Sequence, residues 1–86
     1  MNTKLWLLKP SKDELANPGG MFRNRRYDIA TSMVVRASNR ARARKLASEH
    51  CGDEGKDAWL YATHTTCEEL HADGKECVII RDYKAA

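Results

Sequence analysis

The stretch Ser38–Gly52 constrains the fold most, because it is the longest run of strong helix formers in the chain. Between Arg40 and Leu46 every residue is alanine, arginine, lysine or leucine, the types with the best helix propensities. Ser38 or Asn39 can cap the first turn, and Gly52 can supply the positive φ that often follows a helix. The pattern predicts one main helix that stops at this glycine.

The predicted helix has a narrow apolar face and a wide cationic surface. The residues that share the narrow face at 100° per residue are Asn39, Ala43, Leu46, Ala47 and His50. The cations spread over the rest of the helix are Arg40, Arg42, Arg44 and Lys45. Because alanine lets a helix lie close to a sheet, we expect the alanine face to pack inward and the cations to face outward.

Four segments have the composition of strands. They are Thr3–Lys9, Tyr27–Ala37, Ala58–Thr63 and Lys75–Tyr83. The first is apolar on both faces and ends at Pro10, which favours a central position in the sheet. The second alternates apolar and polar residues, the period of a strand with one buried face.

Two capping-box patterns predict short helical turns. Ser11 and Glu14 have the spacing for one turn, which the sequence 17–20 (Asn-Pro-Gly-Gly) then breaks. Thr66 and Glu69 have the same spacing, and predict a second turn through His71. The order β-β-α-β-β predicts a single α+β domain, residues 1–86, in which one main helix packs on a four-stranded, largely antiparallel sheet.

The composition is that of an ordinary globular domain. Of the 86 residues 31% are charged and 42% hydrophobic, a balance that argues against disorder and against a membrane protein. The apolar run 5–8 is too short for a signal peptide or a membrane span. Three cysteines are too few for a disulfide framework, so we expect a cytoplasmic protein without a membrane partner.

The net charge of +3 conceals an asymmetry along the chain. Residues 1–50 contain 11 Lys and Arg against 4 Asp and Glu, a balance of +7, whereas residues 51–86 contain 4 against 8, a balance of −4. We therefore predict a cationic side on the folded molecule. The predicted partner-binding residues are Arg23, Arg25, Arg26, Arg40, Arg42, Arg44 and Lys45, with Phe22 and Tyr27 as aromatic contacts.

Three interpretations of these residues stay open. The cations can neutralise phosphates of a nucleic acid while an aromatic ring stacks on a base. They can instead be the solvated face of a helix, since arginine and lysine are good helix formers. A protein-binding surface is the third interpretation, because Trp6, Trp59, Tyr61, Phe22 and Met21 are of the types that anchor interfaces when exposed.

Histidine and cysteine offer the ligand types that zinc prefers, in His64, Cys67, His71 and Cys77. Their spacing matches no standard zinc motif, so packing is the favoured interpretation and zinc-dependent folding a lesser hypothesis. No phosphate-binding glycine loop, nucleophile elbow or cofactor fingerprint is present. We expect no enzymatic activity, no catalytic residue, no cofactor and no resident metal.

Several segments together resemble a family of small uncharacterised proteins of bacteriophage and bacterial genomes. These segments are 4–10, 33–37, 43–47, 52–55, 58–60, 65–70 and 78–82, and they span most of the chain. The family has no catalytic signature to transfer. Its helix start is rich in glutamate, whereas this chain has Arg40 and Arg42 there.

The resemblance implies a function by analogy. Small phage proteins of this size are often inhibitors of host defence, with anti-CRISPR proteins as the largest class. The sequence therefore predicts a non-enzymatic binding protein that blocks a host protein or ribonucleoprotein complex through its cationic surface. Direct binding of nucleic acid by the same arginines is the alternative.

Overall fold

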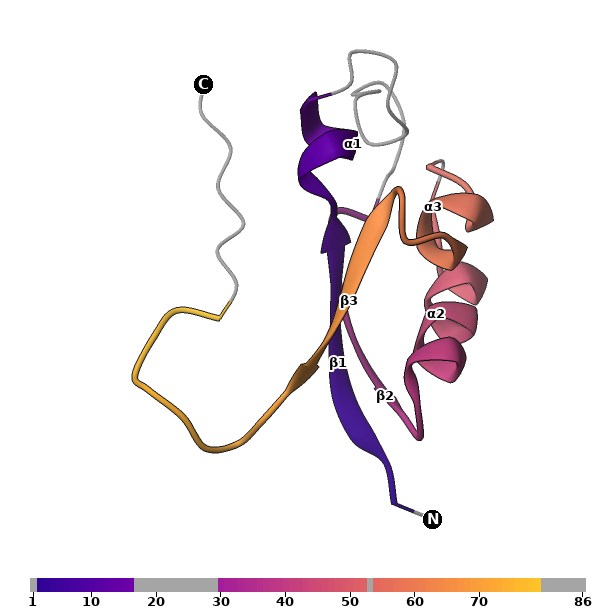
Figure 1. The fold of residues 1–86 in the computed structure, drawn as a ribbon. Helices are drawn as coiled ribbons and strands as arrows, with labels where there is room; N and C mark the ends of the chain where they lie inside the picture. The colour runs from indigo at the N-terminus through magenta and orange to yellow at the C-terminus, as the bar shows by residue number, and fades with distance from the viewer. Residues whose placement is uncertain (1, 17–29, 53, 80–86) are drawn as a thin grey trace.

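The computed structural model describes residues 2–16, 30–52 and 54–79, and these residues form a sheet covered by helices on one face. Its elements are β1 (Lys4–Pro10), α1 (Lys12–Ala16), β2 (Met33–Ala37), α2 (Arg40–Glu49), α3 (Lys56–Leu60) and β3 (Thr65–Leu70). The strand order is β2-β1-β3, with β1 antiparallel to both neighbours. Helices α2 and α3 lie side by side on the same side of the sheet (Figure 1).

The predicted sheet of four strands is wrong, because the described residues form a three-stranded antiparallel sheet. The α+β class is correct. Of the predicted last strand Lys75–Tyr83, residues 75–79 are not in a strand, and residues 80–83 lie outside the described part. The second predicted strand is shorter than expected, since β2 begins at Met33, and its residues 27–29 also lie outside the described part.

Two further predictions exchange helix and strand. The predicted strand Ala58–Thr63 is wrong, because α3 occupies Lys56–Leu60. A helical turn buries the consecutive residues Ala58 and Trp59, whereas a strand would direct one of the two side chains outward. The predicted helical turn from Thr66 to His71 is also wrong, because β3 occupies it. In β3 the buried residues Thr65 and Cys67 alternate with more exposed neighbours, which is the period of a strand.

The central position of β1 agrees with the prediction from its two apolar faces. Trp6, Leu7 and Leu8 are all buried. Trp6 and Leu8 face α2 and α3, and the indole Nε1 of Trp6 donates a hydrogen bond of 3.0 Å to the carbonyl oxygen of Ala37. By alternation Leu5 and Leu7 face the opposite side of the sheet.

Helix α2 matches the predicted main helix. The side chain of Asn39 caps it by accepting a 2.9 Å hydrogen bond from the backbone N–H of Arg42. Ala43 and Ala47 are fully buried against the sheet, as predicted. The helix ends at Glu49 without the predicted glycine cap, since the described glycines with positive φ do not include Gly52.

One apolar core lies between the sheet and the two helices. Its buried members are Trp6, Leu8, Ala37, Ala43, Ala47, Ala58, Trp59 and Cys67. The alanines come mainly from the helices and the large side chains from β1 and α3. This division lets α2 lie close to the sheet, and it brings the long side chains of α2 within reach of the strands.

A buried carboxylate holds the connection between α2 and α3. Glu54 is 5% exposed and accepts hydrogen bonds from the backbone N–H groups of Ala30 and Gly52, both at 3.0 Å, and from the indole Nε1 of Trp59 at 2.6 Å. A buried charge is tolerated when donors surround it in this way. The connection between the two helices is therefore held by a carboxylate that points inward.

The predicted turn at Ser11 is present as α1, with the Ser11 Oγ accepting a 3.1 Å hydrogen bond from the backbone N–H of Glu14. The Ser11 Oγ also donates to the carbonyl oxygen of Thr63, at 2.9 Å. The Glu14 carboxylate is buried and contacts His64 Nδ1 at 2.9 Å. These contacts join α1 to the residues that precede β3.

We predict that Glu54→Ala lowers the free energy of unfolding by about 2–4 kcal/mol, because buried donors lose a charged acceptor. Urea unfolding monitored by Trp59 fluorescence or circular dichroism measures this loss. Glu49→Ala, at the exposed end of α2, is the matched control and should change stability by no more than about 0.5 kcal/mol. Equal losses for the two variants would contradict the role assigned to Glu54.

Candidate functional site

The four cations predicted for the outer surface of the main helix have two different roles. Arg40 and Arg44 donate hydrogen bonds to carbonyl oxygens of β3; of the four, Arg44 is half-buried, and Arg40, Arg42 and Lys45 are exposed. The sequence alone does not separate the arginines that contact β3 from the other cations of the helix, and the binding of a partner by these four residues stays a prediction. The remaining predicted contacts, Phe22, Arg23, Arg25, Arg26 and Tyr27, lie outside the described residues.

Arg44 connects three elements through its guanidinium group. Its Nη1 donates to the carbonyl oxygen of Trp59 at 3.1 Å and to the Oγ1 of Thr65 at 2.9 Å, and its Nη2 donates to the carbonyl oxygen of Thr65 at 2.9 Å. The Oγ1 of Thr65 in turn donates to the carbonyl oxygen of Ala58, at 2.9 Å. The planar arrangement of donors in arginine suits this set of acceptors, which a lysine could not match.

Arg40 makes a similar contact one turn earlier in α2. Its Nε donates to the carbonyl oxygen of Cys67 at 3.1 Å, and its guanidinium carbon lies 5.6 Å from the ring centroid of Trp6. That separation permits a cation–π interaction with the indole. Both arginines therefore fasten α2 to the sheet.

These arginines also cover an edge of the sheet. Alternate residues of a strand direct their peptide groups to the same side, so the carbonyls of Thr65 and Cys67 both point to the edge of β3 that faces away from β1. Arg44 and Arg40 occupy these two carbonyls. A strand edge whose acceptors already have charged donors is a poor template for pairing with another strand.

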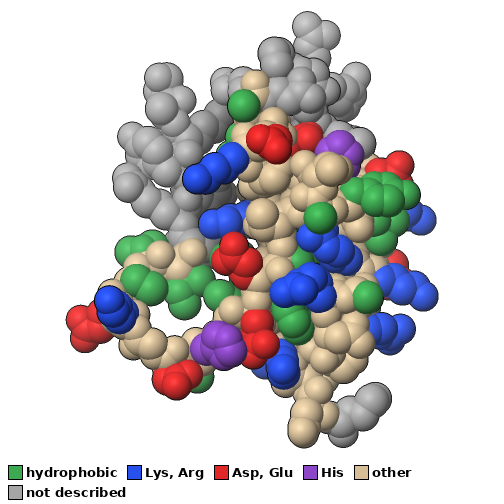
Figure 2. Space-filling model, viewed as in Figure 1, with side chains coloured by type: hydrophobic (Ala, Val, Ile, Leu, Met, Phe, Trp, Pro, Cys, Tyr) green, Lys and Arg blue, Asp and Glu red, His purple; other side chains and the backbone are tan. Residues whose placement is uncertain are grey.

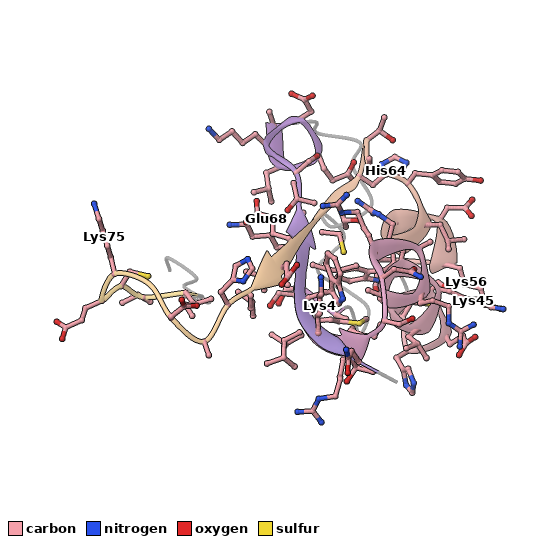
Figure 3. The ribbon with its side chains drawn as sticks, turned by 60° about the horizontal axis from the view of Figure 1, so that its bottom comes forward. Lys4, Lys45, Lys56, His64, Glu68 and Lys75 are labelled. Carbon is pink, nitrogen blue, oxygen red and sulfur yellow. The ribbon has the colours of Figure 1, made fainter. Side chains whose placement is uncertain are left out.

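Within the described residues we define the outward cationic surface as Arg42, Lys45 and Lys56. Arg42 and Lys45 are three residues apart, which makes them neighbours on the surface of α2. Lys56 begins α3, which packs beside α2, and Figure 3 shows Lys45 and Lys56 on the same side of the molecule. Lys and Arg side chains gather over α2 and α3 in Figure 2. No acidic partner is recorded for these three among the described residues.

The tryptophans are core residues rather than interface anchors. Trp6 is 6% exposed and Trp59 is fully buried. Among the residues proposed as aromatic anchors, Tyr61 is exposed, and Phe22 and Met21 lie outside the described part of the chain.

The histidine and cysteine residues are dispersed. His64 contacts Glu14, His71 contacts Glu69 at 3.3 Å, Cys67 is buried under α2, and Cys77 is exposed in the segment after β3. Within the described ranges no three His, Cys, Asp or Glu side chains are placed to hold a metal ion together.

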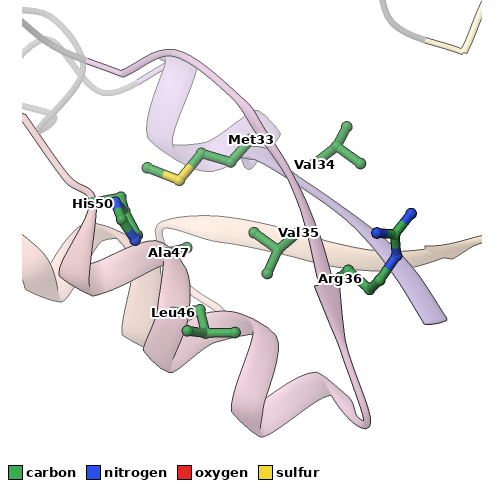
Figure 4. A pocket seen from close by; sticks show the side chains of 7 residues that line it. All are labelled: Met33, Val34, Val35, Arg36, Leu46, Ala47 and His50. Carbon is green, nitrogen blue, oxygen red and sulfur yellow. The ribbon is translucent and has the colours of Figure 1, made fainter. Parts of the chain in front are cut away.

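A groove between β2 and α2 has no counterpart in the sequence prediction. It has a volume of about 460 Å³. Figure 4 shows Met33 and Val35 of β2 facing Leu46, Ala47 and His50 of α2 across it. The alternating pattern of β2 could have indicated that Met33 and Val35 share a face, and the helical pattern that Leu46 lies on the apolar face of α2. Neither pattern predicts the groove between these two faces.

Comparison with protein-family models, with curated proteins and with solved structures produced no match for this chain. The resemblance to a phage and bacterial family therefore stays a prediction. No helix in the described ranges has the length and apolar character needed to cross a membrane.

We predict that Arg44→Met lowers the free energy of unfolding by about 2–4 kcal/mol, because partly buried carbonyl groups lose a charged donor. Arg42→Met, on the exposed side of the same helix, should stay within about 0.5 kcal/mol of the parent. Chemical denaturation of both variants measures the difference. If Arg42→Met proved as destabilising as Arg44→Met, the division into anchoring and outward arginines would be wrong.

The reactivity of the cysteine thiols should report how α2 packs over β3. Burial raises the pKa of the Cys67 thiol, and the nearby charges of Arg44 and Arg40 offset this only in part. Because the thiolate is the reactive form, we predict that iodoacetamide at pH 8 modifies the exposed Cys77 first and Cys67 last. Peptide mass spectrometry over time gives the order.

Proposed function

We propose that this protein is a non-enzymatic binding protein of bacteriophage type that inhibits a complex of the host cell, in the manner of anti-CRISPR and other anti-defence proteins. Its place of action would be the host cytoplasm. The observation that carries the proposal is the outward cationic surface of Arg42, Lys45 and Lys56, which has no recorded acidic partner in the described part of the chain. Such a surface fits an acidic patch on a protein partner.

The way α2 is held supports a binding role. Arg40 and Arg44 fix the helix to the sheet, so that Arg42 and Lys45 stand on an element that need not become ordered when a partner binds. Fixing the scaffold in advance reduces the entropy lost on association.

The engagement of two arginines with the sheet favours a protein partner over nucleic acid. Binding to a nucleic acid backbone grows with the number of phosphates that cations neutralise. Of the predicted phosphate contacts, Arg40 and Arg44 already donate to carbonyl oxygens of β3. Arg23, Arg25 and Arg26 lie outside the described residues, so within the described ranges this leaves Arg42 and Lys45 of the predicted set.

A pull-down from a bacterial lysate tests the proposal. The tagged protein should retain a discrete protein complex, and Arg42→Glu combined with Lys45→Glu should reduce its recovery at least about tenfold, since charges of the wrong sign repel an acidic patch. Lys9→Glu combined with Lys12→Glu changes the net charge equally but lies in β1 and α1, and should leave recovery unchanged.

Two results would count against this function. One is recovery of nucleic acid alone, with an affinity that falls steeply as salt is added, which would establish the alternative of direct phosphate binding. The other is equal loss of the complex in the two double variants, which would show that only net charge matters.

A further inference from the structure

The segment at the end of the described chain carries exposed apolar side chains and pairs with none of the described strands. Residues 71–79 are all exposed and belong to no helix or strand. Val78 is 77% and Ile79 52% exposed, although the sequence around them predicts a strand. Branched apolar side chains are costly to leave in water, and residues 77–79 belong to no strand of the described sheet.

The sheet has one edge that could accept such a segment. The outer edge of β3 is covered by Arg40 and Arg44. At the other edge of the sheet lies β2, and none of the described strands pairs with its outer side. The Thr65 and Cys67 carbonyls face away from β1, and Cys67 is paired with Leu8, which is paired with Met33. Because peptide groups alternate in direction along each strand, Met33 and Val35 direct theirs toward β1, whereas Val34 and Arg36 direct theirs to the outer edge of β2.

Both sides of the β2 edge can receive apolar side chains. Consecutive residues of an added strand would point to opposite faces of the sheet. On one face they would enter the groove lined by Met33, Val35 and Leu46 (Figure 4). On the other they would lie beside Val34, which is 52% exposed. A pair of neighbouring apolar residues, such as Val78 and Ile79, suits this two-sided site.

We propose that residues 77–79 of one copy of this protein pair as a fourth strand with β2 of a second copy, and that the exchange is reciprocal. A reciprocal exchange produces a closed dimer with twofold symmetry. Pairing along a free edge gives backbone hydrogen bonds, and the groove selects the side chains. In an antiparallel register that sets Val78 opposite Val34, Glu76 would lie opposite Arg36, so the charges at the start of the contact would be complementary.

A second copy fits better than the same chain for a geometric reason. The segment leaves from β3, and the sheet order puts β2 at the opposite edge, with β1 between them. Figures 1 and 3 both show residues 71–79 extending from the sheet on the side away from α2. The groove lies between β2 and α2, so the segment points away from its own groove.

Native mass spectrometry and light scattering of the full chain test the proposal. The parent protein should be a dimer at micromolar concentration. The donor variant Val78→Asp with Ile79→Lys should raise the dissociation constant at least about tenfold, because two apolar side chains lose their burial. Tyr61→Lys with Ala62→Asp makes the same changes at exposed positions elsewhere and should leave the dimer intact.

The acceptor edge is tested with proline. Val34→Pro removes an outward N–H and should weaken the dimer similarly, whereas Val34→Thr keeps the N–H and should not. Mixing the donor variant with Val34→Pro should restore a heterodimer, since each copy retains one functional half of the exchange. Circular dichroism confirms that each variant is folded, and a variant that unfolds is replaced by Val34→Lys at the edge.

Three results would overturn the proposal. The first is a parent protein that stays monomeric at about 1 mM, a concentration at which even weak contacts associate. The second is a dimer that survives both the donor and the acceptor variants. The third is the failure of the two variants to form a heterodimer although each is folded. An extended peptide of another protein could occupy the same edge, and in that case the first result would be obtained.

Discussion

The hydrogen bonds donated by the guanidinium group of Arg44 are the interaction on which the described structure most depends. They join α2 to the last turn of α3 and to the first residue of β3, through the carbonyl oxygens of Trp59 and Thr65. The side chain of Trp59 is held from the other direction by Glu54. One tryptophan is thus fixed at its backbone by a cation and at its ring by an anion. Because Trp59 is the largest fully buried side chain, the core is positioned by these two charges.

The same arginines make the two edges of the sheet unequal. At β3 the outward carbonyls are occupied by Arg40 and Arg44, and pairing there would require their displacement. At β2 none of the described strands pairs with the outer edge, which lies beside an apolar groove. The proposed partner surface on the outside of α2 and the proposed dimer edge along β2 are therefore separate. A partner at the first need not interfere with a second copy at the other.

Sequence reasoning succeeded where a local signal and the tertiary environment agree. The apolar run of β1 predicts a central strand, and Asn39 with the alanine-rich run predicts α2 within a residue or two. It failed at α3 and β3, where the local signals conflict with the outcome. A segment centred on Trp59 suits a strand by composition, and Thr66 with Glu69 has capping-box spacing. What decides between the states is burial against α2, which no short window contains.

The candidate site shows the same limit more sharply. Nothing in the sequence distinguishes Arg44 from Arg42, since both are equally good helix formers two residues apart. Their difference depends on what lies beside the helix once it is packed. The charge asymmetry of the chain correctly indicated cations on α2, but not which of them are already engaged. The groove along β2 arises only from the relative position of two elements.

The alanine face of α2 has a consequence for how this protein can vary. Ala43 and Ala47 have no exposed surface, so a larger residue at either position would push the helix outward from the sheet. An outward shift of the helix would change the distance that the Arg44 side chain must span to reach Thr65, and with it the geometry of its hydrogen bonds. Substitutions at the alanines and at the arginines are therefore not independent. In relatives of this protein the volume of the residue at 43 and the identity of the residue at 44 should change together.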